Sequence, residues 1–353
     1  MAIVAESFDF VIGVDTHAKT HTLAVVTADG LVADTGTFPT SSPGLGRATS
    51  WVSKHTGGPE DCFRVLVSME GTGSYGARLA AVLTDAGYQV VEAITPTSRA
   101  RGSRGKNDPI DAQLAARTVL PVDTRRLTTP RSGNLRAALR VLVVAREEMN
   151  GEATRAKHAL LALLRITDLG VDARGHLTGG TLTTVAAWRG REEDLATATA
   201  RTEATRLAKR VLALDLELAG NKTTCQAIVA QMAPRILELP GVGPITAAIT
   251  LLAFSHPGRI HSEAAFAALA GACPIPASSG NTVRHRLNRG GDRRLNRALH
   301  TIVLVRTVYD QTTREYVQRR TAQGRTRREI VRCLKRYVAR QLYRTLNIPT
   351  ATA

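Results

Sequence analysis

Two carboxylates stand three residues apart in the segment Lys106-Asn107-Asp108-Pro109-Ile110-Asp111-Ala112. Asp108 is a favourable helix N-cap, and Pro109 fits the first helical position, where its missing N–H costs nothing. A helix that starts here places Asp108 and Asp111 on one face, where the pair could hold a divalent cation beside a phosphate. An ordinary helix start has the same pattern, with one Asp as cap and another in the first turn. On its own, the segment favours this second, structural interpretation.

Two further carboxylates each end a short apolar run that is typical of a buried strand. Asp15 ends the run from residue 10 to 15, and Glu70 ends the run from residue 63 to 70. In α/β sheets, binding sites gather at the carboxyl ends of the strands. Phosphoryl transfer on nucleic acid uses one or two Mg²⁺ ions held by hard oxygen ligands. Strand-borne acids facing a helical pair could supply such a metal site, formed by Asp15, Glu70, Asp108 and Asp111.

Three other polar side chains lie close to these acids in the sequence. His17 and His21 are four residues apart, but their segment is typical of a hairpin turn, so we interpret them as structural rather than as metal ligands. Tyr75 follows Glu70, and we expect it to shape the loop rather than to act as a nucleophile.

The charge of the chain is strongly basic and unevenly placed. Its 353 residues carry a net charge of +17. Residues 1–117 hold ten Lys/Arg and twelve Asp/Glu, whereas residues 281–344 hold eighteen and four. A solvated helix face normally mixes both signs, so the basic end predicts contacts with nucleic-acid phosphates and strongly salt-dependent binding. The candidate contacts are Arg101, Arg104, Lys106, Arg284, Arg289, Arg293, Arg294 and Arg297.

A glycine-containing loop, residues 239–244, precedes an apolar helical segment. Gly241 and Gly243 could let backbone N–H groups approach a phosphate at the helix N-terminus. An ordinary corner between two helices has the same pattern, and both interpretations stay open.

The elements that would position these residues fall into three predicted domains. Residues 1–120 alternate strands and helices after an initial hairpin, which predicts an α/β sheet. Residues 121–235 contain two long helical stretches, 134–166 and 192–232, separated by a predicted turn at 174–191. They predict a coiled-coil arm that pairs with another copy of the chain. Residues 236–353 predict a basic, all-α domain.

Bulk features exclude several classes of protein. The four cysteines are widely spaced and form no Cys-x-x-Cys pair, which argues against structural zinc and disulfides and fits a reducing cytoplasm. The sequence begins with no signal-peptide pattern, and no apolar run approaches the ~20 residues that span a bilayer. We therefore expect a cytoplasmic protein with no membrane partner.

Several motifs together resemble the DEDD transposase family of bacterial insertion sequences, whose members are also called bridge recombinases. In the N-terminal part these motifs are Val11-Ile12-Gly13-Val14-Asp15, Glu70-Gly71-Thr72-Gly73-Ser74-Tyr75 and the Lys106–Ala112 segment. In the C-terminal part they are Leu239-Pro240-Gly241-Val242-Gly243, Ser278-Ser279-Gly280 and the segment from Arg289 to Arg297. Asn107 departs from the family pattern, in which many members carry Thr or Ser there.

The resemblance implies a RuvC-like, ribonuclease-H-like fold for the N-terminal domain, with Asp15, Glu70, Asp108 and Asp111 as ligands of one or two Mg²⁺ ions. It implies a serine nucleophile directly before a glycine, which selects Ser279, with Ser278 as the second choice. It also implies donor and target DNA, a guide RNA, and a homo-oligomer, dimeric or tetrameric, in which the serine and the acids could meet across protomers. Without the resemblance, Ser278-Ser279-Gly280 is typical of a polar turn.

The leading hypothesis is therefore an insertion-sequence transposase that cuts and rejoins DNA through a phosphoserine intermediate. A RuvC-like nuclease or Holliday-junction resolvase that uses metal-activated water is the enzymatic alternative. A nucleic-acid-binding scaffold whose acids only cap helices is the non-enzymatic one.

Overall fold

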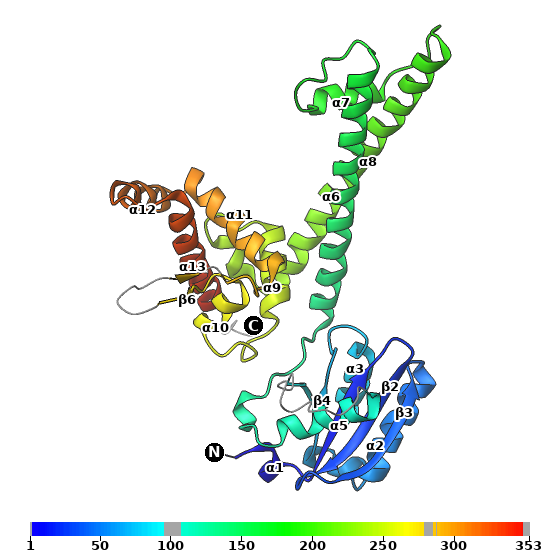
Figure 1. Ribbon diagram of the computed structural model, residues 1–353, viewed down its shortest axis with the longest axis vertical. Helices are drawn as coiled ribbons and strands as arrows, with labels where there is room; N and C mark the ends of the chain where they lie inside the picture. Colours follow the sequence, from blue (N-terminus) through cyan, green and yellow to red (C-terminus); the bar gives the residue numbers. More distant parts are fainter. Residues whose placement is uncertain (1, 95–106, 279–284, 287, 349–353) are drawn as a thin grey trace. The chain divides into compact units, whose positions relative to one another are not determined.

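The computed structural model describes residues 2–94, 107–278, 285–286 and 288–348 (Figure 1). The chain divides into two compact units, Met1–Arg131 and Ser132–Ala353. The first is a mixed α/β unit and the second is largely helical. Among the described residues, no helix is both long and apolar enough to cross a bilayer.

A five-stranded mixed sheet forms the centre of the N-terminal unit. Its strands are β1 (Phe10–Thr16), β2 (Thr20–Thr27), β3 (Val32–Pro39), β4 (Val65–Met69) and β5 (Gln89–Glu92). The order is β3-β2-β1-β4-β5, with β1, β2 and β3 antiparallel and with β4 and β5 parallel to β1. The predicted hairpin and α/β character are confirmed, and β4 is shorter than the apolar run of residues 63–70 that predicted it.

Helices cover both faces of this sheet (Figure 1). The helices α2 (Ser42–His55) and α3 (Ala77–Asp85) pack on the face that includes Ile12 and Val14. On the other face, α5 (Asp108–Val119) packs with Val11 and Leu66, and the short α1 (Val4–Ser7) completes that layer. Two 3₁₀ turns, Pro59–Arg64 and Thr124–Arg126, complete the unit. The alternating side chains of β1 thus contribute to two separate cores, as the period of two in a strand requires.

The approach of α5 to β1 depends on the absence of a side chain at Gly13. A Cβ built on Gly13 would lie 1.9 Å from the carbonyl oxygen of Ala112 and 2.6 Å from the backbone nitrogen of Ala116. The helix presents small residues to the sheet, and the buried Ser68 Oγ donates a hydrogen bond to the Ala115 carbonyl at 2.8 Å. The backbones of α5 and β1 are therefore in direct contact.

Replacing Gly13 by Ala should destabilise the protein. Because backbone rather than a flexible side chain blocks the added methyl group, α5 must shift, and overpacking of this kind costs about 1–3 kcal/mol. Chemical denaturation followed by circular dichroism measures the effect. The matched control is Gly46→Ala in α2, where an added Cβ meets nothing within 4 Å. Since Ala favours a helix by about 0.5–1 kcal/mol over Gly, the control should be neutral or stabilising. Equal midpoints for the two variants would contradict the packing described here.

Two long helices, α6 (Asn134–Ile166) and α8 (Leu195–Met232), pack along each other in the C-terminal unit. Asn221 donates a hydrogen bond across the pair to the Leu142 carbonyl at 3.0 Å, and Arg146 donates to the Leu218 carbonyl at 2.8 Å. Because buried polar groups must be paired, these bonds define the register of the two helices. Both predicted helices are confirmed, whereas the coiled-coil arm as an oligomerisation element stays a prediction.

The prediction of a plain turn at residues 174–191 is wrong, because this segment contains the helix α7 (Gly179–Ala186). Thr178 caps it by accepting a hydrogen bond from the Thr181 N–H, and Leu182 and Val185 are buried against α6 and α8. Tertiary burial thus outweighs the two glycines, which disfavour helix locally.

The remaining helices surround a separate core in the C-terminal unit. They are α9 (Pro244–Phe254), α10 (Glu263–Leu269), α11 (Arg293–Tyr309), α12 (Gln311–Ala322) and α13 (Arg327–Leu346), after a 3₁₀ turn at Pro234–Glu238. Phe254, Phe266 and Tyr343 form a cluster of rings with centroids 6.2 Å apart. This part is not purely α, because β6 (Ile275–Pro276) and β7 (His285–Arg286) form a short antiparallel pair.

Candidate functional site

Asp15 and Glu70 lie at the carboxyl ends of adjacent parallel strands. Val14 of β1 is in register with Met69 of β4, and the Glu70 N–H donates to the Val14 carbonyl at 3.2 Å. The next residues along the two strands, Asp15 and Glu70, are therefore neighbours in the backbone. This is the sheet edge at which the sequence placed both acids.

Asp108 and Asp111 occupy the first turn of α5, as predicted, but the cap lies one residue earlier. The N-cap is Asn107, whose backbone is extended and whose carbonyl accepts a hydrogen bond from the Asp111 N–H at 3.0 Å. The prediction that Asp108 itself is the N-cap is wrong. Asp108 is already helical, and its carboxylate faces His17 rather than a backbone N–H of its own helix.

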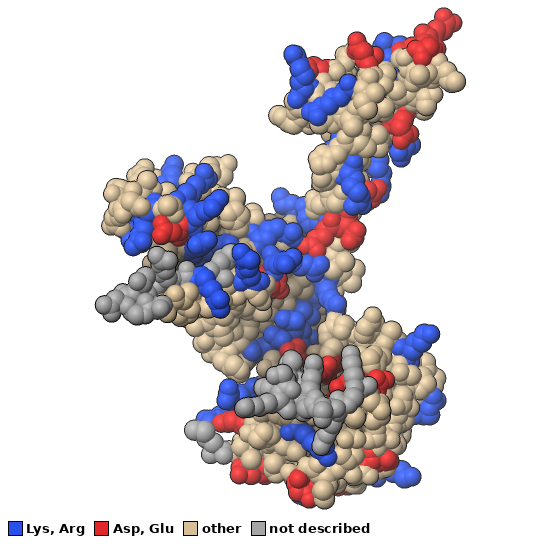
Figure 2. Space-filling model, in the orientation of Figure 1, with Lys and Arg blue, Asp and Glu red and all other residues tan. Residues whose placement is uncertain are grey.

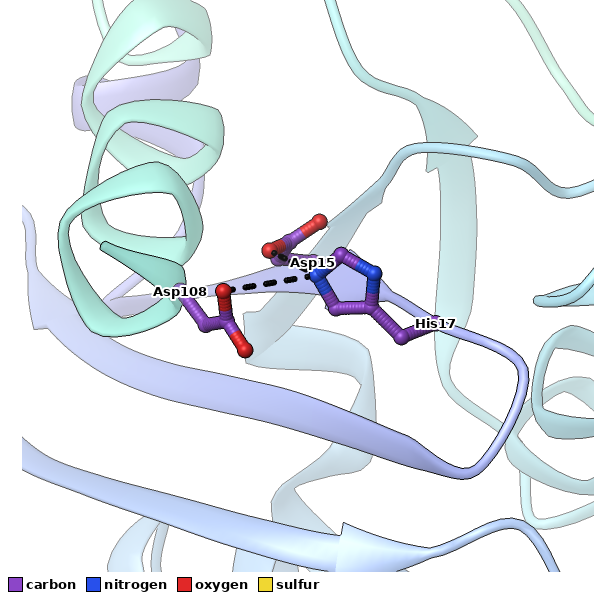
Figure 3. A group of neighbouring side chains, drawn as sticks. All are labelled: Asp15, His17 and Asp108. Atoms are coloured by element: carbon purple, nitrogen blue, oxygen red, sulfur yellow. Dashed lines mark hydrogen bonds and ion pairs between the residues drawn. The ribbon is translucent and has the colours of Figure 1, made fainter. Parts of the chain in front are cut away.

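His17 links the strand acid to the helix acid (Figure 3). Its Nε2 lies 3.1 Å from Asp15 Oδ2 and 3.4 Å from Asp108 Oδ1. One ligand atom from each of the three residues lies within 4.8 Å of the other two. Sequence analysis missed this position because the β1–β2 turn was assigned a structural role. The signal in the sequence was the place of His17 two residues after Asp15, but only the hairpin register of the structure puts both residues at the same edge.

Negative charge is concentrated at this point of the structure. Burial raises the pKa of Asp15, and the nearby carboxylates of Asp108 and Asp111 raise it further, while His17 lowers it. The Asp15 side chain is only 13% exposed. A mostly buried carboxylate with a raised pKa beside other acids is a group that a divalent cation would stabilise, so the donor set fits a metal ion.

His21 belongs to the core rather than to the cluster. It is 1% exposed, and its Nδ1 has no hydrogen-bond partner among the described residues. Burial, followed by the charge of His17, lowers its pKa. This environment favours a neutral ring, in agreement with the structural role expected from the sequence.

Glu70 lies at the lining of a neighbouring cavity. The described residues that line this cavity of about 380 Å³ extend from Met69 to Gly73 and include Glu92 and Ala93. Thr16 Oγ1 donates to the Glu70 carbonyl at 3.2 Å, and Gly71 adopts a φ of +62° directly beside Thr16. The loop after β4 is thereby attached to the end of β1. Glu70 is adjacent to Asp15 in the backbone but is not one of the three residues within 4.8 Å.

The predicted serine and several predicted basic contacts lie outside the described residues. They are Ser279, Arg101, Arg104, Lys106 and Arg284. The second-choice serine, Ser278, is exposed.

The remaining predicted contacts lie within the C-terminal unit. Gly241 has a φ of +73° and stands against α11, while the Gly243 N–H donates to Thr246 Oγ1 at 3.0 Å. Arg289, Arg293, Arg294 and Arg297 are all exposed. Arg294 and Arg297 both pair with Glu147 of α6. A role of these residues in nucleic-acid binding stays a prediction.

Two family models of related transposases match this chain, one in its N-terminal part and one in its C-terminal part. A family model for DEDD transposases of IS110 type matches residues 12–167, and a model for transposases of the IS116/IS110/IS902 family matches residues 233–318. An uncharacterized 43.6 kDa protein of insertion element IS110 from Streptomyces coelicolor is 32% identical over 96 residues, which are 27% of this chain and 24% of that protein. An uncharacterized 42 kDa protein of insertion element IS900 from Mycobacterium paratuberculosis is 33% identical over 141 residues, 39% of this chain and 35% of that protein.

The protein thus combines a mixed α/β unit, in which acids meet at one sheet edge, with a largely helical unit that contains the basic end of the chain. The chain belongs to the IS110 family of DEDD transposases of insertion sequences. The matched stretches span about a quarter and about a third of the two curated relatives.

Replacing Asp15 by Asn should stabilise the protein in the absence of a divalent ion. Because the pKa of Asp15 is raised in the folded state, its charged form opposes folding at neutral pH, and this penalty vanishes as the pH falls below about 4. We expect a higher melting temperature at pH 7, by about 2–4 °C for each kcal/mol of destabilisation removed, and no difference at low pH. Differential scanning fluorimetry over a pH series measures this.

Addition of Mg²⁺ should raise the melting temperature of the wild type but not that of Asp15→Asn. Asp85→Asn, an exposed acid at the end of α3, is the control and should respond like the wild type. If Mg²⁺ raises the melting temperature of Asp15→Asn as much as that of the wild type, Asp15 is not a ligand.

Proposed function

We propose that this chain is a Mg²⁺-dependent DNA transposase whose N-terminal unit is a RuvC-like domain. The observation that carries the proposal is the convergence of Asp15, from a strand end, with Asp108, from the first turn of a helix more than 90 residues later. Together with Glu70 and Asp111, these acids are the proposed metal-binding set. The five-stranded mixed sheet and the family match over residues 12–167 support it.

The proposed role of His17 is to hold the site together before the metal binds. Carboxylate oxygens suit Mg²⁺, whereas imidazole suits softer transition metals. His17 lies between two carboxylates that would otherwise repel each other. We therefore assign the metal to the acids, and we assign His17 to keeping their spacing.

In the proposed reaction, Ser279 attacks a DNA phosphodiester. A bond forms between the serine oxygen and phosphorus, the serine proton is lost, and the bond to the leaving sugar oxygen breaks as that oxygen takes up a proton. The phosphoserine link conserves the energy needed for rejoining. When bound, the metal supplies stabilisation of the charge that develops on the phosphate oxygens. Ser278 is the second choice, since it is the adjacent hydroxyl.

The proposed partners are donor and target DNA and a guide RNA, with assembly into a dimer or tetramer. The basic end of the chain supports a polyanionic partner, because residues 281–344 carry eighteen Lys/Arg against four Asp/Glu. The guide RNA and the assembly rest on family membership alone.

Asp111→Ala should abolish Mg²⁺-dependent strand cleavage of a DNA fragment that carries the element end. Loss of several kcal/mol of charge stabilisation corresponds to a rate reduction of at least about 100-fold. The control is Asp29→Ala, which should cleave at the wild-type rate. Asp29 lies in the turn after β2, away from the sheet edge that carries the other acids. Undiminished cleavage by Asp111→Ala would contradict a role of Asp111 in the proposed metal site.

Ser279→Ala should abolish both cleavage and the covalent protein–DNA adduct that denaturing electrophoresis detects. Ser278→Ala should retain both. If Ser279→Ala cleaves normally and no adduct forms with the wild type, the chain is instead a nuclease that uses metal-activated water. If Ser278→Ala alone loses cleavage and the covalent adduct, the nucleophile is Ser278 rather than Ser279.

A further inference from the structure

The helix α13 carries two parallel rows of side chains, both at a spacing of four residues. The first row is apolar and buried, and it consists of Ile330, Leu334, Val338, Leu342 and Leu346. The second row is made of arginines, and it consists of Arg328, Arg332, Arg336, Arg340 and Arg344. The rows are offset by two residues, or about 200° around a helix. Arg328, Arg332 and Arg344 are exposed, whereas Arg336 and Arg340 are partly buried against α10.

A single carboxylate partly neutralises the C-terminal half of this row. Glu263 of α10 lies 3.0 Å from Arg340, 3.5 Å from Arg344 and 3.9 Å from Arg336. One negative charge thus faces three positive charges. Arg328 and Arg332 are exposed and have no ion-pair partner in the part of the chain that the structure describes. The row therefore keeps most of its positive charge.

Three arginines elsewhere in the chain are each paired with one nearby acid. Arg125 pairs with Asp123, Arg174 with Asp172 and Arg206 with Glu203, each within three residues along the chain. An ordinary solvated face carries such one-to-one pairs. The unbalanced charge of the arginine row is different, and Figure 2 shows Lys and Arg gathered over the α11–α13 part of the C-terminal unit with few acids among them.

The spacing of the row matches an extended polyanion. Consecutive arginines are about 6 Å apart along the helix axis, and the five positions span about 24 Å. Arginine binds phosphate through a planar set of N–H donors. We infer that the arginine row of α13 binds the sugar–phosphate backbone of a nucleic-acid duplex, at a site separate from the cleavage residues.

A duplex fits this surface better than a single strand. Single-strand platforms alternate basic residues with aromatic rings on which bases stack. On α13 the only half-exposed ring beside the row is Tyr337, which packs edge-on against Tyr316. The helix also lies beyond residues 233–318, the segment that matches the family model. The inferred contact with the sugar–phosphate backbone therefore lies outside the residues that match that family model.

The test compares two triple variants that remove the same charge. Arg328→Gln/Arg332→Gln/Arg344→Gln removes the most exposed members of the row and leaves Arg336 and Arg340 on Glu263. The control variant is Arg125→Gln/Arg174→Gln/Arg206→Gln. Binding to a 30-base-pair duplex of scrambled sequence is measured by fluorescence anisotropy in EDTA over a salt series, so that no cleavage contributes.

We expect the slope of log Kd against log salt to fall by about 2.7 in the row variant, since each phosphate contact contributes about 0.9. The control should keep the wild-type slope. Arg328→Lys/Arg332→Lys/Arg344→Lys keeps the charge and should also keep most of the slope, which separates lost contacts from misfolding.

Equal slopes for the row variant and the wild type, an equal loss in the control, or no binding of duplex by the wild type would each overturn the inference. A loss confined to single-stranded DNA of the same length would overturn the choice of a duplex. The inference rests on the proposed nucleic-acid substrate but not on its cleavage. Because duplex binding is measured in EDTA, where no cleavage occurs, failure of the proposed chemistry and failure of this surface give different results.

Discussion

The close contact between β1 and α5 is the constraint on which the candidate site depends. Gly13 has no side chain, so the backbone of α5 lies against the strand at Ala112 and Ala116. Two residues after Gly13 the strand presents Asp15, and one turn before Ala112 the helix presents Asp108. The acids therefore meet because two backbones touch, and the distance between them is held by packing rather than by attraction between the acids.

This packing brings together groups that repel one another. Burial is the largest cause of the raised pKa of Asp15; His17 lowers this pKa, and the neighbouring carboxylates of Asp108 and Asp111 raise it. A site of this kind opposes folding and gains from binding a cation, which is the usual relation between stability and function at metal centres. Thr16 holds the loop after β4 by a hydrogen bond to the Glu70 carbonyl, which keeps Glu70 at the same sheet edge. Glu70 is nevertheless not one of the three residues, Asp15, His17 and Asp108, whose ligand atoms lie within 4.8 Å of one another.

Sequence patterns predicted most helices and strands, but not the features that depend on contacts between distant segments. Strand alternation and helical periodicity are short-range properties, so the hairpin, α2 and α6 were predictable. The helix α7 was not, because its stability comes from burial of Leu182 and Val185 against distant helices. The pairing of Arg297 with Glu147 joins residues 150 positions apart, and the position of His17 depends on strand register. Such contacts follow from tertiary structure, which one sequence without its fold does not specify.

Paramagnetic broadening by Mn²⁺ tests the central claim most directly, because it reports where a divalent ion binds without requiring any reaction. In an amide NMR spectrum of the full-length protein, substoichiometric Mn²⁺ should first broaden the signals of Asp15, His17, Glu70 and the start of α5. Addition of excess Mg²⁺ should restore them. Broadening centred elsewhere, or the same broadening in Asp15→Asn, would contradict a metal site formed by the contact of β1 and α5.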